Sequence, residues 1–347
     1  MVPAGGKYYS VFPLGAVLVN VPAAILRRVH LVQSWPARSL AAAIAGLCVF
    51  FSFRLSHLAE ITSARRVLLA LFPVFGTWTW CNLGFGGAWQ VALGFALAGQ
   101  LACLDYTLLR RRPWLAGFWF AVAFGNRTEL LATLPVYAYF WLTQPTKEND
   151  PESALIGPIS RRKLIDLGRF LAIPALLLLC TAAYNWARFG SPIDFGYARI
   201  PGILKEPWYL HGLFSVSSIR WNAFEMLFRG MGDIGDFPYL RPYGFGCSIF
   251  FATPFLFLLF REGGKHRFLC WTVIGALTLI LWSHGNAGGW QFSYRYAMIL
   301  IPWMFILLTE NGPSRLTATE TTLFIISVLL NGMAVYEFLW TTMIHVS

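Results

Sequence analysis

The chain has 347 residues, of which 57% are hydrophobic and only 12% are charged, and its formal net charge is +11. Soluble domains are about 25% charged, so this composition excludes an ordinary soluble domain, and apolar runs longer than about 18 residues indicate a polytopic α-helical membrane protein. The excess of basic residues is typical of topology signals and of contacts with anionic membrane lipids, and the chain contains no nucleic-acid-binding motif.

The first apolar stretch covers residues 11–26 and is short. Pro13, Asn20 and Pro22 interrupt it, and Arg27 and Arg28 follow it. We expect an interfacial helix lying on the outer face of the membrane, with a membrane span as the alternative.

The apolar runs after residue 38 predict about ten transmembrane helices in a single integral membrane domain of residues 1–347. The expected spans are 39–57, 66–80, 89–109, 113–126, 129–143, 168–187, 245–260, 267–283, 295–309 and 321–340. The runs 113–126 and 129–143 can also be read as one broken pair. The expected fold class is therefore all-α.

Basic clusters predict the orientation of these spans. The clusters at 65–66, 110–112, 161–163 and 261–267 fall in alternate loops, so one face of the membrane can hold them all. That face should be cytoplasmic, because cytoplasmic loops are enriched in Lys and Arg. The outer face then carries residues 1–38 and one larger outer loop, 188–244.

Ionisable residues at an apolar membrane surface are the best pointers to function, and two groups lie early in the chain. Lys7, Tyr8 and Tyr9 form either an aromatic belt or the wall of a pocket that reaches a phosphate or a sugar. Arg127 and Glu129 form either a local ion pair between two half-helices or a site in which the arginine holds a phosphate, since a guanidinium suits phosphate oxygens.

A third group begins where the span 168–187 ends. Asn185, Arg188, Asp194, Tyr197 and Arg199 alternate with aromatic residues, and glycines and a proline force turns between them. This alternation is typical of sites that stack sugar rings and bind their hydroxyls, although an ordinary loop can have the same composition.

The fourth group lies in a glycine-rich turn between two expected spans and holds His284, Trp290, Tyr294 and Arg295. A lone histidine here is more often structural than catalytic. Arg295 is on the expected non-cytoplasmic side, against the usual charge bias. Of the outer arginines it is therefore the one we most expect to bind an anion.

Candidate catalytic acids are few. Asp233 and Asp236 lie three residues apart in the larger outer loop and could contact a divalent metal, although solvated acids in turns are commoner. Glu129 and Asp194 complete the set. The six scattered cysteines predict neither a disulfide framework nor a zinc site, and the chain has no Walker, G-x-S-x-G or H-E-x-x-H motif.

Several segments, in this order, carry a family resemblance: GKYYSVFPLGAVLVNVPAAI (6–25), FGTWTW (75–80), GNRTELLATLPVYAYF (125–140), YNWARFGSPIDFGY (184–197) and GGWQFSYRYAMILIP (288–302). Together they resemble the GT-C superfamily of membrane glycosyltransferases, in the bacterial branch related to protein mannosyltransferases and lipid A aminoarabinose transferases. The resemblance covers nearly the whole chain.

The resemblance implies a polyprenyl-phosphate sugar donor in the outer leaflet, and an aspartate in the first outer loop that activates an acceptor hydroxyl. Positive charge would hold the lipid phosphate, here from Lys7, Arg127 and Arg295. The residues implied in substrate binding are Tyr8, Tyr9, Asn185, Tyr197, His284, Trp290 and Tyr294.

The chain departs from the family pattern at its start. The family places a first span and its aspartate upstream of the Tyr-Tyr element, and neither precedes Lys7 here. The sequence therefore leads us to expect a GT-C glycosyltransferase, or a truncated remnant of one, in a bacterial inner membrane with its active face outward. The alternatives are a transporter or flippase of a lipid-linked or sugar substrate, and a non-catalytic partner of envelope polysaccharide-assembly proteins.

Overall fold

The structure is a computed structural model that describes residues 2–144, 160–233, 235, 239–241, 243, 246–289 and 291–341, without the side chain of Asp233. It is mostly helical, as the composition predicts. The chain forms two compact units: unit 1 comprises Met1–Trp35 and Ala98–Pro201, and unit 2 comprises Pro36–Leu97 and Gly202–Ser347. Helix α6 (Ala88–Leu108) begins in unit 2 and ends in unit 1.

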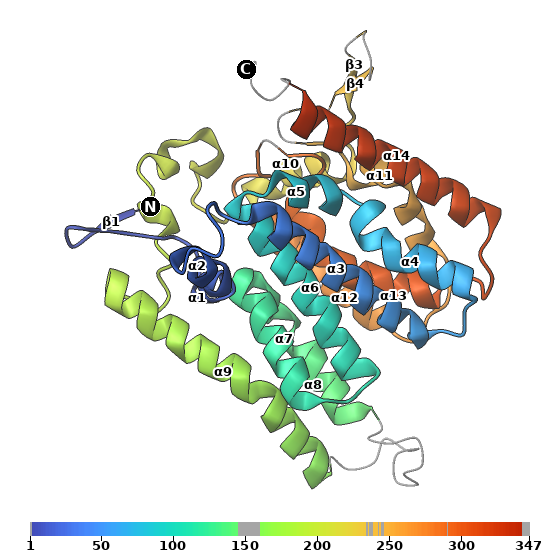
Figure 1. Cartoon of the computed structure of the whole chain (residues 1–347), viewed down its shortest axis with the longest axis horizontal. Coiled ribbons are helices and arrows are strands. Elements are labelled where there is room, and N and C mark those ends of the chain that lie inside the picture. The colour runs from blue at the N-terminus through green and yellow to red at the C-terminus, as the bar shows by residue number, and fades with distance from the viewer. Residues whose placement is uncertain are drawn as a thin grey trace. The chain divides into compact units, whose positions relative to one another are not determined.

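Unit 1 begins with a short antiparallel hairpin, and its helices follow. Its elements are β1 (Val2–Ala4), β2 (Lys7–Tyr9), α1 (Leu14–Leu18), α2 (Val21–Arg28), α7 (Pro113–Asn126), the 3₁₀ helix η2 (Thr128–Thr133), α8 (Leu134–Thr143), α9 (Arg161–Phe189) and η4 (Tyr197–Arg199). Helices α7 and α9 lie side by side (Figure 1). They approach closely because a Cβ at Gly117 would collide with the carbonyl oxygen of Phe170.

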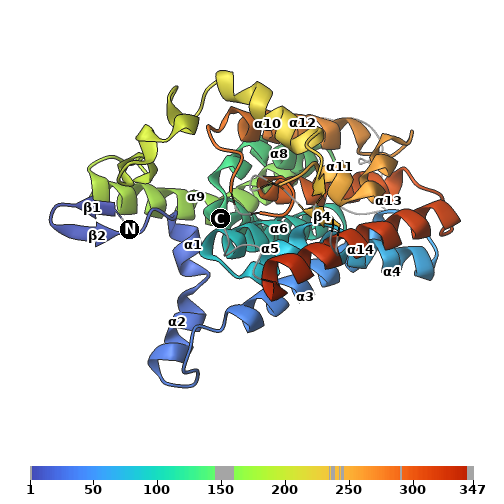
Figure 2. The same ribbon diagram turned by 90° about the horizontal axis from the view of Figure 1, so that it is seen from above.

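Unit 2 holds the remaining elements. These are α3 (Ala37–Leu55), η1 (Ser56–Leu58), α4 (Ser63–Phe75), α5 (Thr79–Phe85), η5 (Ile203–Lys205), η6 (Pro207–Tyr209), α10 (Ser217–Leu227), β3 (Gly232–Asp233), β4 (Leu240–Arg241), α11 (Ile249–Ala252), η7 (Pro254–Phe260), α12 (Arg267–Ser283), η8 (Arg295–Leu300), α13 (Ile301–Glu310) and α14 (Ala318–Trp340). Helix α12 packs against α10, and α14 packs against α4 and α5 (Figure 2).

Within the described residues, four helices are long and apolar enough to cross a membrane: Ala37–Leu58, Ala88–Leu108, Arg161–Phe189 and Ala318–Trp340. They correspond to four of the expected spans. A fifth expected span, 66–80, is a pair of helices, Ser63–Phe75 and Thr79–Phe85, bent by 45°. Membrane character is therefore supported, and the expected count of about ten spans is not.

The other expected spans are shorter or broken. Helix α12 has 17 residues, α7 has 14, and α8 and α13 have 10 each. At 1.5 Å per residue, ten residues extend only about 15 Å, against about 30 Å of hydrocarbon. In the run 245–260, of which 246–260 are described, the helices are α11 and the 3₁₀ helix η7, and they are separated at the non-helical Thr253 before Pro254.

The apolar stretch 11–26 is divided at Asn20 into α1, of 5 residues, and α2, of 8 residues. Neither reaches the length of a span. Leu18, Ile25 and Leu26 are exposed, and Arg27 and Arg28 occupy the last turn of α2. This arrangement fits the expected interfacial helix, whose contact with lipid stays a prediction.

A buried ion pair and its hydrogen bonds join four segments of unit 2. Arg65 and Glu320 are each 1% exposed and are joined by a 3.1 Å hydrogen bond from Nε to Oε1. Arg261 donates to the same oxygen at 2.9 Å. Arg65 also donates to the carbonyl oxygens of Leu308 and Thr309 at the end of α13. Arg65, which the sequence places in a surface cluster, is thus an internal residue of the unit.

Candidate functional site

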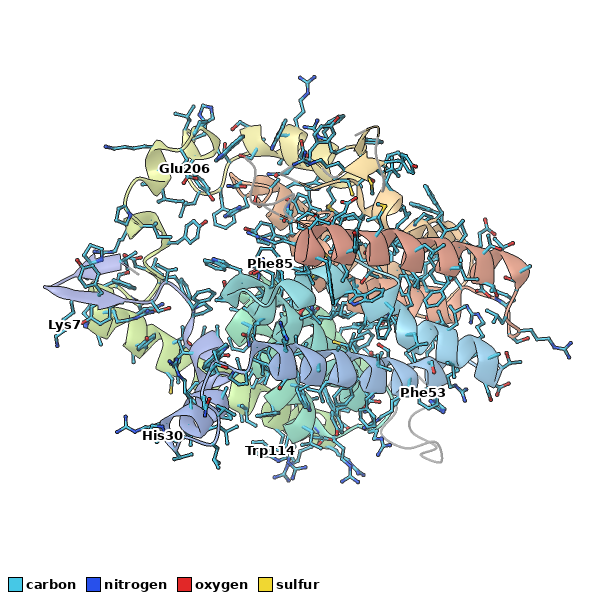
Figure 3. All side chains as sticks on the ribbon, turned by 45° about the horizontal axis from the view of Figure 1, so that its top comes forward. Lys7, His30, Phe53, Phe85, Trp114 and Glu206 are labelled. Atoms are coloured by element: carbon cyan, nitrogen blue, oxygen red, sulfur yellow. The ribbon has the colours of Figure 1, made fainter. Side chains whose placement is uncertain are left out.

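Two of the four candidate groups meet in unit 1, where the first hairpin lies against the end of α9. The guanidinium of Arg188 donates through Nη1 to the Ser10 carbonyl oxygen at 2.6 Å. The Tyr9 ring stands edge-on to Phe189, with centroids 6.1 Å apart. Lys7 and Tyr8 are exposed, and Lys7 points outward from the hairpin (Figure 3). The hairpin is thus anchored at its end, while its lysine is open to solvent.

Asn185 and Arg188 hold the turn that leaves α9. Asn185 is fully buried, and its amide donates to the Pro192 carbonyl oxygen at 3.1 Å. Its side-chain oxygen accepts a 2.6 Å hydrogen bond from Arg188 Nη2. Both polar ends of the Asn185 side chain are therefore used in the fold. Its predicted role in substrate binding stays a prediction.

Asp194 is fixed at the far side of the same turn. One carboxylate oxygen accepts from the Gly196 backbone N–H at 2.6 Å, and the other accepts from Arg199 Nε at 2.8 Å. Partial burial raises the pKa of Asp194, but these two donors outweigh it, so the pKa lies below its ordinary value. The half-buried Tyr197 follows in η4. A carboxylate held ionised in this way is a weak base.

Arg127 and Glu129 form a local ion pair at the break between α7 and η2. The Arg127 Nη2 and Glu129 Oε1 atoms are 2.6 Å apart, and the two side chains are 14% and 15% exposed. This is the first of the two alternatives given by the sequence. The pair carries no net charge, so an anion at Arg127 would have to compete with Glu129.

The fourth group lies in unit 2, in the turn after α12. Three rings surround the half-buried His284 edge-on, those of Tyr209, Phe214 and Tyr296, with centroids 5.5–5.9 Å away. Tyr294 is fully buried, and its hydroxyl donates to the Leu281 carbonyl oxygen. His284 and Tyr294 therefore shape the turn, and Trp290 lies outside the described residues.

Arg295 is the cation of this turn. It donates to the Gly289 carbonyl oxygen at 3.1 Å and to the Tyr296 hydroxyl at 3.3 Å. Its Nε is buried without a hydrogen-bond partner, and no carboxylate pairs with it among the described residues. Arg295 is thus a half-buried arginine whose hydrogen-bond partners are neutral, and its anion-binding role stays a prediction.

An apolar cavity of about 1270 Å³ lies in the same unit. Its wall includes Met226, Phe250, Phe257, Phe260, Trp271 and Trp282. Trp282 belongs to the last turn of α12, directly before the turn that holds His284 and leads to Arg295 at the start of η8. The Asn222 amide ties the two regions together, because it donates to the carbonyl oxygens of both Trp282 and His284.

The candidate acids give no metal centre within the described part of the chain. No group of three or more His, Cys, Asp or Glu side chains comes together there. Asp236 lies outside the described residues, as does the side chain of Asp233, so the expected Asp233–Asp236 metal contact stays a prediction.

The candidate acids chosen from the sequence do not include Glu337, which is buried. Glu337 lies in α14 and is 1% exposed. A single acid inside the last apolar run, in AVYEFLW, was a usable signal, because ionisable residues within membrane segments are rare and tend to be functional.

Comparison of the chain with known protein families, curated proteins and solved structures finds no significant match. A function therefore has to be argued from the residues and their geometry.

Proposed function

We propose that the chain is a membrane glycosyltransferase of the GT-C type. It would transfer a sugar from a polyprenyl-phosphate donor to an acceptor on the non-cytoplasmic face of a bacterial inner membrane. The family part of this proposal rests on the ordered sequence resemblance.

One structural observation carries the proposal. Helix α12 lines an apolar cavity with Trp282 and ends one residue later, at Ser283, and the turn that follows leads to Arg295 at the start of η8. A polyprenyl phosphate has the same two parts, an apolar chain and an anionic head group. The cavity suits the chain, and the guanidinium suits the phosphate, since its neutral partners leave its charge uncompensated.

The proposal gives each group a role. Arg295 holds the donor phosphate, and the rings around His284 offer aromatic faces and edges to a sugar. The acid that activates the acceptor belongs to the candidate set of Glu129, Asp194, Asp233 and Asp236. Of these, Glu129 and Asp194 already hold arginines.

A binding measurement tests the phosphate contact first. The full chain in nanodiscs would be titrated with a polyprenyl monophosphate and the complex counted by native mass spectrometry. Arg295→Gln should weaken binding by about 10- to 100-fold, because a hydrogen bond to a charged group contributes about 1.5–3 kcal/mol. Arg315→Gln is the control, since Arg315 is an exposed arginine of the same unit. Equal affinities of the two variants would contradict the proposed role of Arg295.

A transfer assay then tests the reaction itself. The wild-type chain would be incubated with radiolabelled polyprenyl-phosphate sugars and bacterial envelope acceptors, and label that leaves the lipid would be counted. Binding without transfer would remove the enzymatic part of the proposal and keep the lipid site.

A transporter is the second candidate, and a repeated break supports it. In each unit an arginine precedes or begins a six-residue 3₁₀ helix, η2 or η8, and a ten-residue α-helix with proline at its second position follows. Short, interrupted helices in both halves are typical of transporters. Movement of a lipid-linked sugar across proteoliposome membranes without glycosyl transfer would favour this function.

A further inference from the structure

Helix α14 buries two glutamates in opposite chemical settings. Glu320, near its start, accepts hydrogen bonds from Arg65, Arg261 and Thr317. Glu337 lies about 25 Å further along the helix, is equally buried at 1% exposure, and has no hydrogen-bond partner at either carboxylate oxygen within the described residues. A buried group left without partners in a native fold requires an explanation.

Among the described residues, no counter-ion makes contact with the Glu337 carboxyl. Among the elements packed on α14, α5 contributes Cys81, whose thiol is already directed to the Ala334 carbonyl oxygen, and Cys247 precedes α11. Both thiols lie within electrostatic range of the Glu337 carboxyl. Helix η7 has no titratable residue. The basic residues of α4, Arg65 and Arg66, lie at the Glu320 end of α14.

One cation acts on Glu337 from a distance. Arg241 lies on β4, in the hairpin near the C-terminal end of α14 (Figure 1), within electrostatic range of the Glu337 carboxyl. Arg241 is exposed, and no hydrogen bond joins it to Glu337. The Glu337 carboxyl is thus near the positive charge of Arg241 but forms no hydrogen bond with it.

The chemistry of the site selects its ligand. An isolated carboxylate is strongly disfavoured in an apolar interior. A Ca²⁺ or Mg²⁺ ion would need about six oxygen ligands, and the described residues bring no three potential metal-ligating side chains together. A proton needs only one carboxylate oxygen. We propose that Glu337 is a proton-binding site in α14 that takes up and releases a proton near neutral pH.

The proposal does not depend on the proposed glycosyl transfer. Intramembrane acids of this kind are the residues through which membrane proteins take up and release protons. Proton binding at Glu337 would change the charge inside unit 2. Cys247 lies near this carboxyl and also approaches the backbone of Ser293, two residues before Arg295.

A hydrophobic carbodiimide, dicyclohexylcarbodiimide, tests the proposal on the full chain in neutral-lipid nanodiscs. The O–H of a protonated carboxylic acid adds across one C=N bond of the reagent. The oxygen bonds to the central carbon and the proton goes to nitrogen, so no group leaves. Peptide mass mapping then reports both glutamates of α14 in one sample, with Glu320 as the internal control and Glu337→Gln as the blank.

The expected result is labelling of Glu337 and not of Glu320 at neutral pH. Labelling should fall about tenfold per pH unit above the midpoint of titration, since only the protonated acid reacts. Equal labelling of the two glutamates would overturn the argument from missing donors.

Infrared spectroscopy provides a second test that does not require the carbodiimide to reach the buried Glu337. The wild-type minus Glu337→Gln difference spectrum should contain the C=O stretch of a protonated carboxylic acid at neutral pH and lose it at alkaline pH. Absence of that band at neutral pH would overturn the proposal, whatever the labelling shows.

Discussion

The same substitution at the two glutamates of α14 should have very different effects on stability. Glu320→Gln removes the charge that faces both Arg65 and Arg261, and Arg65 is 1% exposed. Breaking one partner of a buried ion pair costs about 3–5 kcal/mol, because the other charge stays buried. Glu337→Gln breaks no hydrogen bond of the side chain, so we expect a change below about 1 kcal/mol.

The assay is unfolding of each variant in mixed micelles, followed by far-UV circular dichroism. The wild type and the two variants would be compared at one detergent composition and neutral pH. We expect the wild type and Glu337→Gln to have similar free energies of unfolding, and Glu320→Gln to have a clearly lower one. A Glu337→Gln variant as unstable as Glu320→Gln would refute the reasoning, since it would mean that Glu337 is held by an ion pair.

Three further predictions concern unit 1. Gly117→Ala should destabilise the chain by about 1–3 kcal/mol in the same assay, because its Cβ would meet the Phe170 backbone. Gly168→Ala in the exposed part of α9 has open space and should stabilise by up to about 1 kcal/mol. The Asp194 carboxylate, whose pKa is lowered, should contribute below about 1 kcal/mol. This contribution is present above the unfolded-state pKa of about 3.9 and is lost as the pH falls through the lower folded-state value. A difference between wild type and Asp194→Asn that does not shrink on acidification would contradict this assignment.

The long helices could be predicted from the sequence because their apolar runs are long and carry few charges. The runs 39–57, 89–109, 168–187 and 321–340 each became one helix of at least 19 residues. The runs 245–260 and 295–309 are equally apolar, but each contains a proline at which the helix begins anew. Hydrophobicity alone does not separate a span from the core of a compact unit.

Among the contacts of the candidate residues, those between near neighbours in the sequence could be predicted, and those between distant residues could not. The Arg127–Glu129 pair was one of two alternatives visible in the sequence, because its members are two residues apart. Arg65 and Glu320 are 255 positions apart, and no pattern in a single sequence joins them. Arg65 was therefore predicted as a topology signal in an exposed basic cluster; its side chain is instead buried in an ion pair, and the predicted orientation stays a prediction.

Arg127 and Arg295 lie in similar local settings, and the sequence composition alone does not predict that their partners differ. Arg127 directly precedes, and Arg295 begins, a six-residue 3₁₀ helix that is followed by a ten-residue α-helix. Two positions after the arginine, one copy has Glu129 and the other has Ala297. The glutamate neutralises Arg127, whereas the alanine leaves Arg295 with a carbonyl and a hydroxyl as partners. Arg127 is thus held in an ion pair in unit 1, whereas the hydrogen-bond partners of Arg295 in unit 2 are neutral, and the proposed anion site is therefore placed at Arg295.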